Sequence, residues 1–359
     1  MPGRRRTPSD DAREPGRAPS LPRGRRPVRC ASLHSPTMAE PLRGTPQRPR
    51  EPRRPLDPRD FPGCRAVHLP VEELDDHEGR IEYWEARSGT AMILAEPATL
   101  YHDVPSAGVT GLVEMISQAR GSRILALGSA DLVQFGEHGR YQVLMQPDAM
   151  FFLDRPWPRE RAIDVDVGPL PDVVLEVDHT TDIRRRKLEV YASWGFPEVW
   201  VEVPSPDWMA PRTSGRPRLT VYLLDGDGYV ESAVSRAFPG WRAAEIHRAM
   251  NEETKSAETV AALRRVGRGL GRASGTSPDD DPFLGAERAE SRSEMLRENL
   301  RQTLAARNIR VTEAVEAWLS GVTSVERSAQ FLEAAIDSRD ASDFLRRVRP
   351  AGDAPPDDG

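Results

Sequence analysis

The chain has 359 residues and a formal net charge of −6, and 38% of its residues are hydrophobic, enough to bury the core of one or two domains. Its two cysteines, Cys30 and Cys64, exclude a disulfide framework and a cysteine-based zinc site, and no apolar run is long enough to cross a membrane. Gly-Lys-Ser/Thr does not occur, which excludes a Walker A nucleotide loop, and a reducing cytoplasm is the expected location.

Residues 1–60 differ in composition from the rest of the chain, with 15 arginines, 13 prolines and seven acidic residues. They show no hydrophobic periodicity, so we expect an unstructured tail, within which Met38 is an alternative start of translation. The other residues include 35 basic and 49 acidic side chains. This balance argues against a uniformly basic nucleic-acid-binding surface but is compatible with a local basic patch.

The composition becomes typical of a globular domain over residues 68–250. Apolar residues recur at helical spacing between 107 and 120, which predicts one amphipathic helix. Three segments rich in Val, Leu and Phe are predicted to be strands, namely 124–135, 141–153 and 171–178.

The best-marked helix is predicted over residues 182–194. Thr180-Thr181-Asp182 supplies residues that can cap its first turn, and Gly195 stands where a left-handed residue commonly ends a helix. Alternating apolar residues predict two further strands at 198–203 and 219–224. The order α-β-β-β-α-β, with extra strands after it, predicts an α/β fold with a central mixed sheet.

The pattern beyond Trp241 is helical. Residues 251–283 are predicted to be a helix and a linker, with the Gly267-Arg-Gly-Leu-Gly271 run at the end of that helix. Residues 284–348 are predicted to form a helical extension. We expect this extension to be a solvated appendage or a homo-oligomerisation element, with positioning of DNA as the alternative.

Acidic residues stand at the ends of two predicted strands. Glu176 and Asp178 close the segment 171–178 and share one face of it, while Asp148 opens a strongly apolar strand. If these strands pair, Asp148 and Glu176 converge and can bind a divalent ion such as Mg²⁺, which takes one or two carboxylates and keeps several waters. The alternative is that the strand end is simply solvated.

Lys187 lies in the apolar stripe of the 182–194 helix. It is one of only two lysines, against 48 arginines, which indicates that a compact ammonium is needed here. A lysine in such a stripe can also snorkel to the surface, and this alternative stays open. Two acids, a lysine and a covering helix are typical of metal-assisted phosphodiester hydrolysis, in which the lysine orients the nucleophile or stabilises the developing charge.

Four spaced motifs occur within about residues 70–245: Pro147-Asp148, Pro171-Asp-Val-Val-Leu-Glu-Val177, Lys187-Leu-Glu-Val-Tyr191 and Gly195-Phe-Pro-Glu-Val-Trp-Val-Glu-Val203. At these positions the sequence resembles the Uma2 family of restriction-endonuclease-like proteins, members of the PD-(D/E)XK nuclease superfamily. The set of four is far more specific than any one motif.

The resemblance implies an α-β-β-β-α-β nuclease core that cleaves DNA with Mg²⁺, or Mn²⁺, as its cofactor. It implies that Asp148 and Glu176 bind the metal and that Lys187 is the family's helix lysine. Tyr191 matches a tyrosine that follows one turn later, and Glu82 matches a glutamate near the start of the family's domain.

The chain departs from the family at Asp178-His179, where an apolar residue and a serine are common. Asp178 is therefore either a third acid for a second metal or a cap of the following helix. Two rival functions stay open. One is a non-catalytic interaction protein, such as a mobile-element accessory, that retains the fold. The other is a hydrolase of small phosphate esters, since the excess of acidic residues after position 60 fits a small substrate better than DNA.

Overall fold

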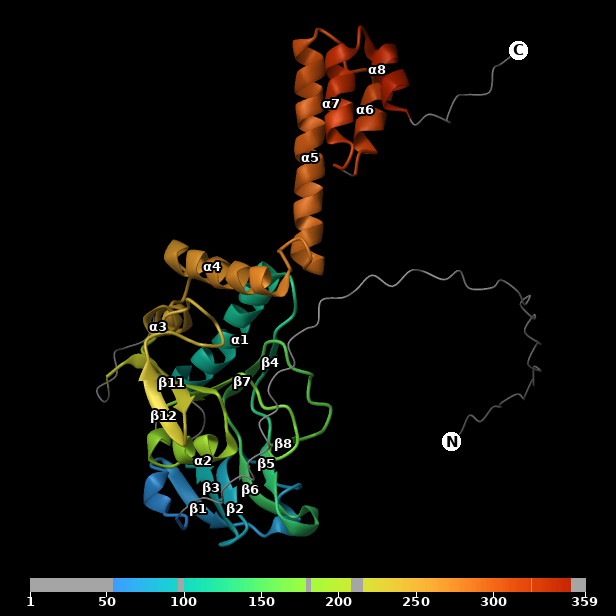
Figure 1. Cartoon of the computed structure of the whole chain (residues 1–359). Coiled ribbons are helices and arrows are strands. Elements are labelled where there is room, and N and C mark those ends of the chain that lie inside the picture. The colour runs from blue at the N-terminus through green and yellow to red at the C-terminus, as the bar shows by residue number, and fades with distance from the viewer. Residues whose placement is uncertain (1–53, 96–99, 179–181, 208–215, 324, 350–359) are drawn as a thin grey trace, which may run out of the picture. The chain divides into compact units, whose positions relative to one another are not determined.

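The computed structural model describes residues 54–95, 100–178, 182–207, 216–323 and 325–349. Within these residues the chain is a mixed α/β protein with two mixed six-stranded sheets and eight α-helices (Figure 1). Most of the tail predicted for residues 1–60 lies outside the described residues. Among the described helices, none is both long and apolar enough to cross a membrane.

The first sheet, sheet A, has the strand order β1-β3-β2-β6-β5-β8. Its strands are β1 (Cys64–His68), β2 (Ile81–Glu85), β3 (Thr90–Leu94), β5 (Leu132–Phe135), β6 (Tyr141–Met145) and β8 (Ile163–Asp164). All neighbours are antiparallel except β5 and β8, which are parallel. Short 3₁₀ helices precede β1 and β2, at η1 (Pro58–Asp60) and η2 (Val71–Glu73).

The second sheet, sheet B, has the strand order β12-β11-β10-β9-β7-β4. Its strands are β4 (Leu125–Leu127), β7 (Ala149–Phe152), β9 (Val173–Val177), β10 (Glu198–Val203), β11 (Arg218–Asp225) and β12 (Gly228–Ser232). The central strands β9 and β10 are parallel, because a helix connects them, and every residue in both is buried. The other neighbours in sheet B are antiparallel.

Two segments predicted to be single strands are each divided between the sheets. Segment 124–135 contributes β4 to sheet B and β5 to sheet A, and segment 141–153 contributes β6 to sheet A and β7 to sheet B. Pro147 stands at the second division, where it has no N–H to donate to a ladder. Apolar residues occur on both sides of each division, so hydrophobic periodicity alone does not reveal where one strand ends and the next begins.

Three helices cover one face of sheet B: α1 (Leu100–Arg120), α3 (Ala243–Asn251) and α4 (Ala257–Ser274). The predicted apolar stripe of α1 is buried there. The glycine run expected at a helix end lies inside α4 instead. A Cβ on Gly267 would lie 2.6 Å from the carbonyl oxygen of Ile116, so this glycine allows α4 to approach α1 closely.

The other face of sheet B packs against η4 (Ile183–Arg185), α2 (Lys187–Trp194) and sheet A. The predicted 182–194 helix is thus a 3₁₀ turn followed by an α-helix. Asp182 caps the 3₁₀ turn by accepting from the N–H of Arg184, and Gly195 ends α2 with a left-handed φ of 79°. Both terminal signals identified in the sequence are confirmed.

Four helices at the C-terminal end have a hydrophobic core of their own: α5 (Pro282–Ala306), α6 (Glu313–Ser320), α7 (Ser328–Asp337) and α8 (Ala341–Val348). The ring of Trp318 lies edge-on to Phe331 and to Phe344, with centroids 5.1 and 5.2 Å apart. Asp340 caps the start of α8 by accepting from the N–H of Asp343. The extension therefore has a folded core.

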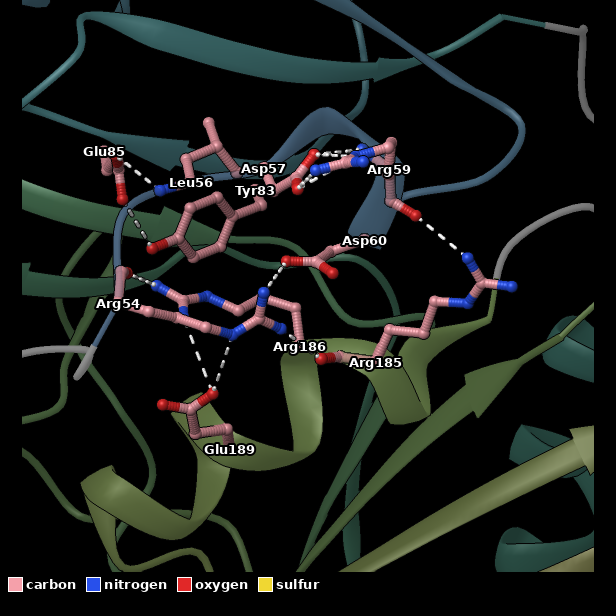
Figure 2. A network of polar contacts seen from close by, with 10 residues as sticks. All are labelled: Arg54, Leu56, Asp57, Arg59, Asp60, Tyr83, Glu85, Arg185, Arg186 and Glu189. Carbon is pink, nitrogen blue, oxygen red and sulfur yellow. Dashed lines mark hydrogen bonds and ion pairs between the residues drawn. The ribbon is translucent and has the colours of Figure 1, made fainter.

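Residues 54–60, which we expected to be unstructured with the rest of the tail, contact η4 and α2 (Figure 2). Arg54 donates to the carbonyl of Arg185 at 2.8 Å, and Arg186 donates back to the carbonyl of Arg54 at 2.7 Å. Arg185 in turn donates to the carbonyl of Arg59 at 3.0 Å. The folded body therefore begins several residues earlier than composition indicated, because these contacts use backbone carbonyls that leave no signature in the sequence.

Candidate functional site

Two of the predicted acids lie at one end of the β7–β9 pair. The strands are antiparallel, with Ala149 opposite Leu175, and the N–H of Asp148 donates to the carbonyl of Leu175 at 3.1 Å. Asp148 at the start of β7 and Glu176 near the end of β9 are therefore brought to the same end of sheet B. This is the pairing that the sequence analysis required for the two carboxylates to converge.

Lys187 in the first turn of α2 points at these acids. Its Nζ lies 2.8 Å from both carboxylate oxygens of Glu176 and 2.7 Å from Oε2 of Glu82 in β2. Lys187 and Glu176 are each only 1% exposed. The alternative that Lys187 snorkels to the surface is wrong, since its ammonium ends in a buried ion pair.

Tyr191, one turn after Lys187, also contacts Glu176. Its hydroxyl donates to Oε1 of Glu176 at 2.5 Å, and burial raises the pKa of the phenol well above its usual range. The tyrosine is therefore a protonated donor that fixes the orientation of the carboxylate. Glu82, Glu176, Lys187 and Tyr191 form one connected group.

Arg80 joins Asp148 to this group. Its Nη1 lies 2.5 Å from Oδ1 of Asp148, and its Nε lies 2.7 Å from Oε1 of Glu82. The sequence analysis missed this residue, although its two-residue spacing from Glu82 in an extended segment is a usable signal. Because Glu82 contacts both Arg80 and Lys187, two cations link three carboxylates.

The Asp148 carboxylate also holds the strand beside it. Its Oδ2 accepts a 2.5 Å hydrogen bond from the N–H of Val177, the residue after Glu176. One oxygen of Asp148 thus faces β9 and the other faces Arg80. This contact fixes the carboxylate relative to Glu176, which is the arrangement a shared ligand would need.

The site combines strong desolvation with close counter-charges. Burial raises the pKa of Glu176 to about 7, against the lowering effect of Lys187. Burial alone would lower the pKa of Lys187, but the carboxylates of Glu176 and Glu82 outweigh it and the net shift is upward. Lys187 is therefore a permanent cation at physiological pH.

Asp178 lies apart from these contacts. Its Oδ1 accepts from the N–H of Ile183 at 3.2 Å, and its Oδ2 lies 3.0 Å from Nη2 of Arg184. Burial raises the pKa of Asp178 to about 7. Of the two roles that the sequence left open, these contacts are those of a cap for the segment that leads into α2.

The donor chemistry at this end of sheet B fits a hard divalent cation. Mg²⁺ is bound through carboxylate oxygens and waters, and one or two carboxylates suffice. Within the part of the chain that the structure describes, no three Asp, Glu, His or Cys side chains are arranged as a ready metal site. Arg80 and Lys187 lie between the carboxylates instead, so Asp148 and Glu176 are the pair we consider as ligands.

One comparison with known proteins gives a match. The family model Uma2, described as "Putative restriction endonuclease", matches residues 68–251, which is half of the chain. This range includes Arg80, Glu82, Asp148, Glu176 and Lys187. Neither a curated protein nor a solved structure is significantly similar to the chain.

Proposed function

Because the chain belongs to the Uma2 family, we propose that it is a metal-dependent DNA endonuclease that hydrolyses phosphodiester bonds. The observation that carries the proposal is the position of Lys187. Its ammonium lies 2.8 Å from Glu176 and 2.7 Å from Glu82, at the end of the strand pair where Asp148 also lies. A buried lysine held among carboxylates from two sheets is more than the fold needs, since burying charge opposes stability.

Asp148 and Glu176 are the residues that would bind Mg²⁺, or Mn²⁺ in its place. When bound, the ion would polarise a phosphoryl oxygen and lower the pKa of its water. The protein supplies the orientation of both carboxylates. Asp148 is held by the N–H of Val177, and Glu176 is held by Tyr191.

Lys187 acts in this proposal through its charge rather than as a base. Its raised pKa keeps the ammonium protonated, so it can stabilise the negative charge that develops on the phosphoryl oxygens. Its burial keeps water away from the charge and strengthens that interaction. Tyr191 serves as a positioning residue, because it touches Glu176.

The order of elements in sheet B supports a PD-(D/E)XK-type core. Along the chain, α1 is followed by β4, β7 and β9, then by α2 and β10. This order agrees with the α-β-β-β-α-β core that we propose. All six strands of sheet A come from the segments before α1 and between β4 and β9. Asp148 directly precedes the second strand of the proposed core, Glu176 lies in its third strand and Lys187 lies in its second helix.

Two exposed arginines lie at the segment that leads into α2. The side chain of Arg185 is 52% exposed, and that of Arg59, whose carbonyl it contacts, is 89% exposed. Arg59 is paired with Asp57 at 2.7 Å and Arg185 with Asp182 at 3.5 Å, so these arginines do not form a net basic patch. DNA as the substrate therefore rests on the match to the Uma2 family.

The test is nicking of supercoiled plasmid with Mg²⁺, Mn²⁺ or EDTA. We expect wild type to nick only with metal, and Asp148→Asn to lose at least about 10²-fold in rate, the scale for one preorganised electrostatic group. Asp172→Asn is the matched control. Asp172 lies at the other end of the same strand pair, where it accepts from the N–H of Leu153, so its loss should leave nicking intact.

The rival functions give different results in the same assay. A folded wild type that cleaves none of several DNA substrates with either metal would indicate a non-catalytic interaction protein. Cleavage of a small phosphodiester such as bis(p-nitrophenyl) phosphate, without cleavage of DNA, would indicate the small-ester hydrolase. Equal nicking by wild type and Asp148→Asn would place the activity at another site or in a contaminant.

A further inference from the structure

The guanidinium of Arg80 occupies an oxygen of Asp148, one of the two proposed metal ligands, and links it to Glu82. It contacts Oε1 of Glu82 at 2.7 Å and Oδ1 of Asp148 at 2.5 Å. We propose that Arg80 holds a divalent-cation position in the metal-free protein and leaves it when the metal binds. This inference rests on the proposed function, since it concerns the metal of that same site.

The charges at the site support an exchange rather than an addition. Three carboxylates face two monovalent cations, Arg80 and Lys187, so one negative charge remains when all are ionised. A divalent ion in place of Arg80 leaves no net charge, whereas a divalent ion beside Arg80 leaves an excess of positive charge. Arg80 contacts Oδ1 of Asp148, so an ion that binds this oxygen has to displace Arg80.

Arg80 is the cation that can withdraw. Its side chain is 23% exposed and it lies just before β2, at the edge of the site, although its Nη2 also donates to the carbonyl of Gln146 at 3.4 Å. Lys187 is 1% exposed and lies in the first turn of α2, among the buried residues between the sheets. Withdrawal of Lys187 would need a path through that core.

The first experiment measures Mn²⁺ binding by isothermal titration calorimetry. Arg80→Met removes the competing charge and keeps most of the side-chain length, and Arg80→Lys keeps a charge but loses the fork that spans two carboxylates. We expect Mn²⁺ to bind Arg80→Met at least about tenfold more tightly than wild type, with Arg80→Lys between them. Arg65→Met, which removes an exposed arginine of β1, is the control and should match wild type.

Location of the ion is tested in the same background. Asp148→Asn added to Arg80→Met should remove the gain in affinity, since Asp148 loses its charge. Equal or weaker Mn²⁺ binding by Arg80→Met than by wild type would overturn the inference, as would an absence of Mn²⁺ binding in both. If Arg80→Met binds Mn²⁺ tenfold more tightly but wild type cleaves no DNA, the exchange of Arg80 for the metal is supported and the nuclease function is not. If wild type cleaves DNA but Arg80→Met shows no tighter Mn²⁺ binding, the nuclease function is supported and the exchange is not.

A second experiment uses wild type alone, in case Arg80→Met does not fold without metal. Phenylglyoxal modifies accessible arginines, and mass spectrometry measures the extent at each site. Saturating Mn²⁺ should raise modification of Arg80 and leave that of Arg65 unchanged. Unchanged or reduced modification of Arg80 would show that the guanidinium stays in place and would overturn the inference.

Discussion

Two glutamates on neighbouring strands of sheet B are equally buried but differ in the partners they use. Glu176 lies opposite Val201 in the β9–β10 register, and Glu202 lies one position on, opposite Val177, so the two side chains point to opposite faces. Glu202 contacts Nδ1 of His247 and Nδ2 of Asn251, each at 2.7 Å. Both of its partners belong to one helix, α3.

The Glu202 group ties one helix to one strand. Asn251 also donates to the carbonyl of His247 and accepts from the N–H of Ser205, so its partners are local or backbone groups. Glu176, by contrast, meets an ammonium that also binds Glu82 from the other sheet. Burial of a carboxylate therefore does not mark a functional residue; the presence of cations shared among several carboxylates is the stronger indicator.

The largest expected difference is between isosteric variants of these two glutamates. Glu176→Gln should reduce metal-dependent DNA cleavage by about 10³-fold or more, because it removes a ligand charge and the partner of Lys187. Glu202→Gln should keep cleavage and lower the free energy of unfolding by about 1–3 kcal/mol, the cost of disturbing a buried hydrogen-bonded group. Plasmid nicking and thermal unfolding of both variants measure this contrast. Loss of cleavage in a folded Glu202→Gln would contradict the distinction between a functional Glu176 and a structural Glu202.

The chain's only two lysines give the next contrast. Lys187→Met should reduce cleavage about 10²-fold, because it removes the charge-stabilising ammonium from the site. Lys255→Met should not change cleavage, since the bonds that Lys255 makes within the described residues go to the carbonyls of Ala249 and Glu252, outside the site. Circular dichroism confirms that each variant is folded before rates are compared. Similar rates for the two variants would show that Lys187 has no part in the reaction.

A third buried carboxylate, Asp178, follows the last residue of β9, and its backbone N–H donates to the carbonyl of Glu202. Burial raises its pKa to about 7, while the pKa of an aspartate in an unfolded chain is about 3.9. Between these values the folded state binds a proton that the unfolded state does not, so stability rises as pH falls. Relative to Asp178→Asn, wild type should gain at most about 1.4 kcal/mol per pH unit from pH 7 down to 4.

Denaturant unfolding of both proteins at several pH values measures this dependence. Parallel curves for wild type and Asp178→Asn would mean that Arg184 keeps the carboxylate ionised when folded.

The smallest expected effect concerns the support of α2. Removal of residues 1–53 should leave the melting temperature within about 2 °C, because this segment lacks the apolar content to pack. Removal of residues 1–60 takes away the carbonyl of Arg54, which accepts from the fully buried Arg186. That loss of about 1–3 kcal/mol should lower the melting temperature by several degrees. Differential scanning calorimetry compares the melting temperatures of the two truncated proteins. Equal melting temperatures would show that the contacts of residues 54–60 do not contribute to stability.

Local signals in the sequence were sufficient for the elements that carry Glu176 and Lys187. The alternation in β9 places Glu176 on the face opposite Val173, Leu175 and Val177. These two valines and one leucine lie in the core that sheet B forms with α1, α3 and α4. Gly195 ends α2 as expected. Each of these features depends on residues a few positions apart, which periodicity and capping preferences describe well.

The features that the sequence did not reveal depend on contacts between distant segments. Pro147 separates β6 and β7, which belong to different sheets. Only the pairing of each strand with its neighbours shows that they are separate strands. Arg80 is part of the site because it contacts Asp148, which lies far from it along the chain. The contact of Arg186 with the carbonyl of Arg54 depends on no side chain at position 54 at all. A single sequence carries no signal for such pairings.

The division of the chain between two sheets has a consequence for the order in which activity appears. Glu82 belongs to sheet A and Glu176 to sheet B, and the contact of Glu82 with Lys187 joins positions 105 residues apart. Contacts of such long sequence separation are slow to form, because a large loop has to close first. A chain with only one sheet folded would therefore hold an incomplete set of site residues. During refolding, cleavage activity should follow the docking of the sheets rather than the formation of helices, so that a partly folded molecule leaves DNA intact.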